Sequence, residues 1–317
     1  VVVGLTMHLP GRRAERVSID WRGAGLLAAG LAALTLLCSW GGSQYPWTSA
    51  PIIMLGLVAV AALAAFGAVE RRVTEPVLSL ALFRSRNFTA ATALTFLTGF
   101  AMFGAVTFLP QFQQNVQGAS ATSSGLQLLP LMGGMLVISL LGGQLVTRTG
   151  RYRGLLIAGS MIMTAGLGLL ATMSVTTGQL TTSVYMVVLG VGMGLLMQTT
   201  MLVVQNSVAQ RDVGVASGAA TLFRTIGGSI GVSLLGTLFA QQVQSALPDR
   251  DGGAPSGGQL TPSMLEALPA PVREAYQSAI TSGIHQVFLW GAVIAVVALI
   301  AAWAIRKVPL RGSVTAR

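Results

Sequence analysis

The sequence predicts an all-helical integral membrane protein with eight transmembrane helices, on the evidence of its composition, its apolar runs and its charge placement. Hydrophobic residues make up 53% of the 317 residues and charged residues only 9%, and the mean hydropathy is +0.72. A helix needs about 20 apolar residues to cross roughly 30 Å of hydrocarbon. Runs of this kind predict spans at 22–40, 50–69, 88–110, 124–146, 154–174, 183–206, 217–240 and 284–305.

The positive charges predict how these spans are oriented. If the segment before the first span is cytoplasmic, all of the 19 Lys and Arg residues except Arg250 and Arg273 belong to inner segments. The short outer loops at 41–49, 111–123 and 175–182 contain no charged residue. We therefore expect a multi-pass protein of the cell (inner) membrane with a cytoplasmic C-terminus. The net charge of +10 reflects this topology, and no basic patch interleaved with aromatic residues indicates a nucleic-acid partner.

The chain divides into two linking helices and a six-helix unit. Because it begins Val-Val-Val at the tail of an apolar run, we interpret it as a fragment that lacks its N-terminal part. Within the last outer loop, an amphipathic stretch from Pro271 is expected to lie on the outer interface and to lead into the last span. The expected units are the end of a preceding transmembrane helix (1–9), two linking helices (10–69), a cytoplasmic linker with an interfacial helix after Pro76 (70–87), a six-helix bundle (88–306) with an outer loop at 241–283, and a cytoplasmic tail (307–317).

Glycines inside the spans predict close helix packing rather than cofactor binding. The stretch Gly23-Ala24-Gly25-Leu26-Leu27-Ala28 matches the dinucleotide fingerprint only formally, because it opens a membrane helix and follows no strand. Gly227 and Gly231 form a small-xxx-small pair, which lets helix backbones approach each other in lipid. With two histidines and one cysteine, the chain cannot assemble a nucleophile, base or metal cluster, so neither enzyme activity nor a cofactor or metal is expected.

Four stretches resemble a known transporter family. Gly143-Gln144-Leu145-Val146-Thr147-Arg148-Thr149-Gly150-Arg151 resembles the major facilitator signature loop G-x-L-x-D-R-x-G-R, with Thr147 in place of the aspartate. The segment from Asp20 through Gly23 to Leu26 resembles the D-x-x-G-x-x-L motif of the seventh helix of the fourteen-helix drug:proton antiporters (EmrB/QacA type). Leu109-Pro110-Gln111-Phe112-Gln113-Gln114 resembles that family's loop between helices nine and ten, and Phe223-Arg224-Thr225-Ile226-Gly227-Gly228-Ser229-Ile230-Gly231 resembles its thirteenth helix.

This resemblance implies a fold, a function and an incomplete chain. The chain would be helices seven to fourteen plus the stub of helix six, including the C-terminal six-helix bundle of a major facilitator fold, without the N-terminal six-helix half. It would export drugs or amphipathic small molecules in exchange for protons by alternating access. The alternatives are an exporter of a native metabolite or siderophore-like compound, and a non-transporting structural membrane protein.

The ionisable residues leave this half without an obvious proton carrier. Every acidic residue falls in a loop or at a helix edge, and no histidine lies at mid-span. Intramembrane ionisable groups are the usual proton relays, so the coupling carboxylates are expected in the missing half. Arg224 would lie about one turn inside the membrane. It either extends its charge to the headgroups or pairs near the inner gate with a carboxylate of the missing half.

The substrate wall is expected on the third and sixth spans, which the resemblance identifies as cavity-lining helices. Adaptable methionine and aromatic surfaces suit apolar ligands of varied shape, although core packing explains the methionines equally well. The residues predicted for this wall are Thr95, Phe96, Met102, Phe103, Met193, Met197 and Gln198.

Overall fold

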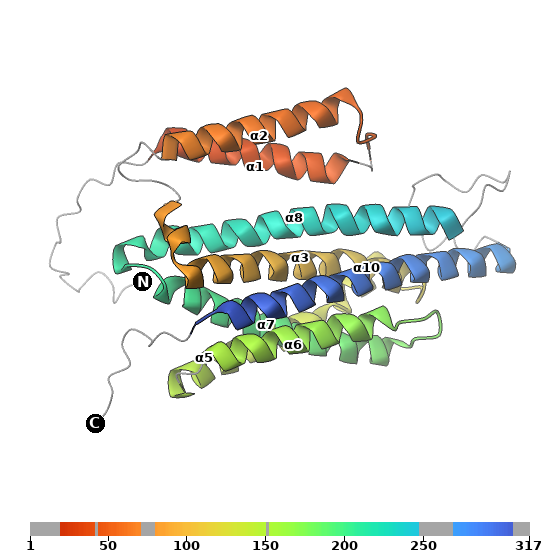
Figure 1. The fold of residues 1–317 in the computed structure, drawn as a ribbon. Coiled ribbons are helices and arrows are strands. Elements are labelled where there is room, and N and C mark those ends of the chain that lie inside the picture. Colours follow the sequence, from red (N-terminus) through yellow and green to blue (C-terminus); the bar gives the residue numbers. More distant parts are fainter. Residues whose placement is uncertain (1–19, 42–43, 71–79, 150–151, 247–268, 307–317) are drawn as a thin grey trace, which may run out of the picture.

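Eight helices of the described residues are long and apolar enough to cross a membrane, which confirms the predicted fold class. The computed structural model describes residues 20–41, 44–70, 80–149, 152–246 and 269–306. The long helices are α1 (Trp21–Trp40), α2 (Ala50–Glu70), α3 (Arg86–Asn115), α5 (Leu129–Thr149), α6 (Tyr152–Ala171), α7 (Gln179–Asn206), α8 (Val213–Ala246) and α10 (Ala270–Ala304) (Figure 1). Three short helices connect them: η2 (Leu80–Arg84), α4 (Ala121–Leu126) and η3 (Gln210–Asp212).

Six of the long helices form one bundle, and α1 and α2 form a hairpin beside it (Figure 1). Helix α7 packs against α5, α6 and α3, while α10 packs against α6, α3 and α8. The hairpin contacts the bundle through α1 and α8. This division agrees with the two linking helices and six-helix unit expected from the sequence.

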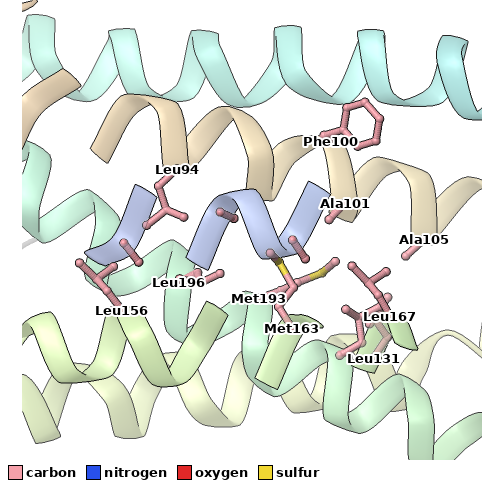
Figure 2. Close-up of a cluster of buried hydrophobic side chains, with 14 of the residues drawn as sticks. Leu94, Phe100, Ala101, Ala105, Leu131, Leu156, Met163, Leu167, Met193 and Leu196 are labelled. Carbon is pink, nitrogen blue, oxygen red and sulfur yellow. The ribbon is translucent and has the colours of Figure 1, made fainter. Parts of the chain in front are cut away.

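Helices α3 and α7 are the central helices of the bundle. In the most apolar stretch of each, 61% of the residues are buried, compared with 22% in the span that contains α5. Figure 2 shows part of the buried core that α3, α6 and α7 share. Helix α3 contributes Leu94, α6 contributes Leu156 and Met163, and α7 contributes Met193 and Leu196. The exposed leucines of α5, together with Met132 and Val137, suit contact with lipid, because lipid tails are as apolar as these side chains.

Glycines set the distances between the bundle helices. A Cβ built on Gly227 of α8 would collide with the backbone carbonyl of Phe96, and one built on Gly99 of α3 would collide with the carbonyl of Arg224. Gly190 and Gly194 of α7 meet the α5 backbone at Leu131 and Met135 in the same way. The α3–α8 and α5–α7 pairs therefore pack backbone against backbone, as small residues permit in lipid.

Helix α3 continues beyond its expected end. The segment from Leu109 to Gln114, expected as part of an outer loop, is helical, and Pro110 lies inside α3. Proline removes one helical hydrogen bond, but the following turn is held from outside the helix, because Gln114 Nε2 donates to Ser124 Oγ of α4 at 2.8 Å. The side chain of Asn115 also donates to the Gln111 carbonyl at 2.9 Å.

Both ends of the segment expected as an outer loop at 241–283 are helical as well. Helix α8 runs to Ala246, and α10 begins at Ala270 as one continuous helix. The stretch expected to lie flat on the interface is therefore the first part of α10. Gln242 Nε2 donates to Ser282 Oγ at 3.1 Å, and Gly283 leaves room for the ring of Phe239. These contacts support both helices beyond their apolar parts.

The expected interfacial helix after Pro76 is only partly within the described residues, because 71–79 lie outside them. The described part is the single turn η2, which packs on the bundle. Leu82 is buried, and the ring of Phe83 contacts those of Phe88 and Phe223 at centroid distances of 5.2 and 5.8 Å. The ring of Phe83 therefore joins η2 to α3 and α8.

Candidate functional site

A small hollow lies where α3, α7 and α8 meet. Its volume is about 20 Å³, enough for one water-sized group. Three threonines and one arginine supply its polar atoms, and leucine, methionine and alanine form the rest of its wall. The lining residues are Thr95 and Thr98 of α3, Leu196, Met197, Thr200 and Met201 of α7, and Ala220 and Arg224 of α8.

The three threonines differ in whether their hydroxyl groups are engaged. Thr95 and Thr98 donate to the carbonyls of Ala91 and Leu94, four residues earlier in their own helix, at 2.9 and 2.8 Å. Thr200 is 3% exposed, and its Oγ1 has no hydrogen-bond partner. A buried hydroxyl normally finds a partner. Among the three threonines, Thr200 is therefore the one whose hydroxyl has no hydrogen-bond partner.

Glycine packing fixes Arg224 beside these threonines. Its backbone carbonyl lies against Gly99, less than a turn from Thr98 on α3. The Arg224 side chain is partly buried and forms no ion pair with any residue that the structure describes. Arg224 therefore lies at the hollow, and its charge has no neighbouring carboxylate among the described residues.

The depth of the hollow follows from helix lengths. Arg224 is eleven residues after Val213, or about 16 Å along α8, and Thr95 is about 14 Å along α3. Helix α8 has 34 residues and is about 51 Å long, so it extends about 10 Å beyond each side of a hydrocarbon layer of roughly 30 Å if centred on it. With α8 centred in this way, the Cα of Arg224 lies about one turn inside that layer.

The structure brings three of the predicted site residues together: Thr95, Met197 and Arg224 line the hollow. Phe96 and Phe103 instead contact glycines of α8: the backbone of Phe96 lies against Gly227, and the ring of Phe103 lies against Gly228.

The remaining predicted wall residues lie away from the hollow. Met102 is partly buried against the hydrophobic core. Met193 is fully buried there, next to Met163 (Figure 2). Gln198 is exposed, and its side chain faces Gly143 of α5.

The motif that begins at Asp20 has a clear structural role. Asp20 caps α1, because its Oδ1 accepts from the backbone N–H groups of Arg22 and Gly23 at 3.1 and 2.9 Å. A side chain at Gly23 would collide with Asp20 Oδ2 and come within 3.3 Å of Glu70 Oε2. Glu70, the last residue of α2, is 5% exposed. The glycine therefore allows two carboxylates to lie close together at the base of the hairpin.

The other motif residues are structural where they are described. Gln114 joins α3 to α4, Gly227 and Gly231 pack against α3, and Gly143 lies at the α5–α7 contact. Arg148 is in the last turn of α5, whereas Gly150 and Arg151 of the same sequence motif lie outside the described residues. Thr200 was not among the predicted residues, because the sequence does not show that its hydroxyl, unlike that of Thr199, lacks a partner.

Across the described ranges, the chain holds no group of three or more histidine, cysteine and acidic residues that could bind a metal ion. The acidic residues of the long helices lie near helix ends, at Glu70 in α2 and Glu274 in α10. The hollow therefore offers a cation and hydroxyl groups rather than carboxylates. Such a site is suited to hydrogen-bond acceptors.

These features define a helical membrane protein that spans the bilayer several times, with a small polar hollow between three core helices. The chain belongs to the Major Facilitator Superfamily, whose model matches residues 10–232. Members of this superfamily are transporters rather than enzymes, and this membership confirms the prediction from the sequence that the chain is not an enzyme.

The chain is similar to several curated transporters over most of its own length. It is 40% identical over 306 residues to an uncharacterised MFS-type transporter of Mycobacterium tuberculosis, covering 94% of this chain and 44% of that protein. Identity is 34% to the multidrug transporter protein MdtP of Bacillus subtilis, covering 78% of this chain and 46% of the relative. For the tetracenomycin C resistance and export protein of Streptomyces glaucescens, identity is 36% and the coverages are 79% and 46%. The chain thus spans less than half the length of these relatives.

A solved structure shares the fold. The bacterial homologue of the human lysosomal transporter Spinster, in an inward-facing and occupied conformation, has a TM-score of 0.58 and 16% sequence identity. The match covers 89% of this chain and 64% of that chain.

Proposed function

We propose that the chain is the C-terminal part of a drug:proton antiporter of the fourteen-helix type, which exports drugs or amphipathic small molecules. In this proposal, a six-helix half precedes the two linking helices and supplies the coupling carboxylates. Substrate binds between the halves, and the two bundles rock around it in alternating access. The identities to multidrug and antibiotic-export proteins, and the share of their length that the chain spans, support this reading.

The observation that carries the proposal is the hollow at the junction of α3, α7 and α8. It combines a charged group, a free hydroxyl and adaptable methionines at membrane depth, where ionisable residues are usually functional. In the proposal, Thr95, Met197 and Arg224 contact substrate directly. Phe96, Met102, Phe103, Met193 and Gln198 form the surrounding wall as the bundles move.

Export of a native metabolite is a second candidate. It is favoured by the 36% identity to a protein that exports the antibiotic tetracenomycin C. The same hollow and the same transport cycle would serve either substrate, so this candidate changes the physiological compound and leaves the mechanism as proposed.

The orientation can be tested by cysteine labelling. In a Cys38→Ser background, we expect cysteines at Ser120 and Thr176 to react with an impermeant maleimide added to intact cells, because both lie in charge-free loops. Cysteines at Ser85 and Gln210 should react only after the cells are opened. Labelling of the second pair in intact cells would reverse the proposed orientation.

Proton-driven efflux tests the function itself. Inside-out vesicles that contain the full-length protein should accumulate a fluorescent drug when their interior is acidified, and a protonophore should release it. Accumulation that ignores the proton gradient would contradict antiport. Vesicles prepared without the protein control for passive partitioning.

A further inference from the structure

We propose that the hollow is a binding subsite for an acidic oxygen group of the transported molecule, so that the exporter prefers amphipathic organic acids to lipophilic cations. This inference rests on the proposed function and specifies the substrate class of the same site. It is carried by two unused hydrogen-bond donors, the size of the hollow and the local balance of charge.

The donors are Arg224 and Thr200. The guanidinium group carries N–H donors in a fixed fork that matches a carboxylate, and it faces no carboxylate of the described chain. The Thr200 hydroxyl is buried and unpartnered at the same hollow. The hydroxyl groups of Thr95 and Thr98 already donate hydrogen bonds to backbone carbonyls of their own helix. The two free donors therefore lie on different helices, Arg224 on α8 and Thr200 on α7, and each can donate to an acceptor in the hollow.

The size of the hollow selects a single functional group. At about 20 Å³, it is suited to a compact polar group such as a carboxylate rather than to the body of a drug-sized molecule. Leu196, Met197 and Met201 flank it with apolar surface, against which the body of an amphipathic molecule can lie. A carboxylate anchored on Arg224 and Thr200 would thus leave the rest of the molecule on the methionine-rich wall.

The charge of the hollow discriminates against cations. No acidic side chain lines it, and Arg224 is its only charged lining residue among those described. A lipophilic cation would meet like charge in a poorly solvated place, where electrostatic interactions are stronger than in water. An organic anion would instead find its counter-charge already in position.

The unpartnered hydroxyl also points to a ligand on energetic grounds. A buried hydroxyl without a partner costs folding free energy, whereas an apolar group of the same shape does not. Valine has nearly the shape of threonine, so Thr200→Val should leave the ligand-free protein as stable as the wild type or more so. If the hydroxyl binds substrate, the same variant should lose substrate affinity.

The experiment compares three probes in vesicles containing the full-length protein: dansyl-labelled undecanoic acid, its methyl ester and tetraphenylphosphonium. For the wild type, we expect transport of the acid with an apparent affinity about tenfold higher than for the ester, and weak transport of the cation. Thr200→Val should weaken the apparent affinity for the acid about tenfold, with little effect on the ester. Its thermal unfolding midpoint should not fall.

Thr199→Val is the matched control. Thr199 is the neighbouring residue of α7 and is fully buried, but its hydroxyl donates to the Leu195 carbonyl at 2.7 Å and it does not line the hollow. Its affinity for the acid should equal that of the wild type.

Each other outcome overturns the proposal. Equal transport of acid and ester would show that the acidic group is not recognised. A uniform loss for all three probes in Thr200→Val would show that the hydroxyl does not recognise the acidic group of the substrate. Proton-driven export of tetraphenylphosphonium alone would overturn the subsite but keep the antiporter, whereas no proton-driven export of any probe would remove the proposed function itself.

Discussion

Gly227→Ala is expected to lower the thermal unfolding midpoint of the protein by about 5–10 °C. The added methyl group would strike the carbonyl of Phe96, which belongs to the α3 backbone and cannot move aside as a flexible side chain can. Overpacking of this kind costs about 2–3 kcal/mol, and each kcal/mol corresponds to about 2–4 °C for a domain of this size. Scanning fluorimetry of the purified protein in detergent measures the shift.

Gly218→Ala provides the matched control on the same helix. A Cβ at Gly218 would meet nothing within 4 Å, and alanine is the better helix former by about 1 kcal/mol. Its midpoint should equal or exceed that of the wild type. Equal midpoints for both variants would mean that α3 and α8 do not pack backbone against backbone.

Arg224→Lys is expected to abolish most efflux while leaving insertion and expression unchanged. Lysine keeps the positive charge and a long stem, so it can still reach the headgroups if Arg224 serves only as an anchor. It cannot reproduce the planar fork that binds two oxygens at once. A site that needs this fork therefore fails with lysine, and truncation to glutamine should be at least as damaging. Initial efflux rates in vesicles with equal protein content measure the effect.

Arg211→Lys is the control for this experiment. Its side chain is 88% exposed and lies 3.7 Å from Asp212, in a surface pair of the kind that contributes little. Its efflux should match that of the wild type. Unchanged efflux in Arg224→Lys would reduce Arg224 to a lipid anchor.

The spans could be predicted because hydrocarbon thickness imposes a length and composition on each. The placement of the positive charges then predicts which loops face the cytoplasm. The extensions of α8 and α10 could not be predicted in the same way. Their outer turns are polar, and they are helical because Gln242 meets Ser282 and Phe239 meets Gly283 from different parts of the chain.

The sequence predicts where the central helices begin and end better than it predicts which side of each helix faces the core. The polar residues of α7 do not gather on one side of the helix, so no amphipathic pattern shows which side faces the core. Met193 and Met197 are one turn apart, yet the first is buried in the core and the second lines the hollow. Thr200 was missed because threonines in membrane helices usually bond to their own backbone, as Thr199 does, and only tertiary packing shows the exception.

The most direct test of the central claim compares vesicles containing residues 1–317 with vesicles containing the full-length protein. The described helices hold no acidic residue at mid-span, and ionisable residues at that depth are the usual proton carriers. We therefore expect proton-driven accumulation of a fluorescent drug with the full-length protein and none with residues 1–317 at equal protein content. Proton-driven transport by residues 1–317 alone would contradict the claim that this chain is one part of a two-part exporter.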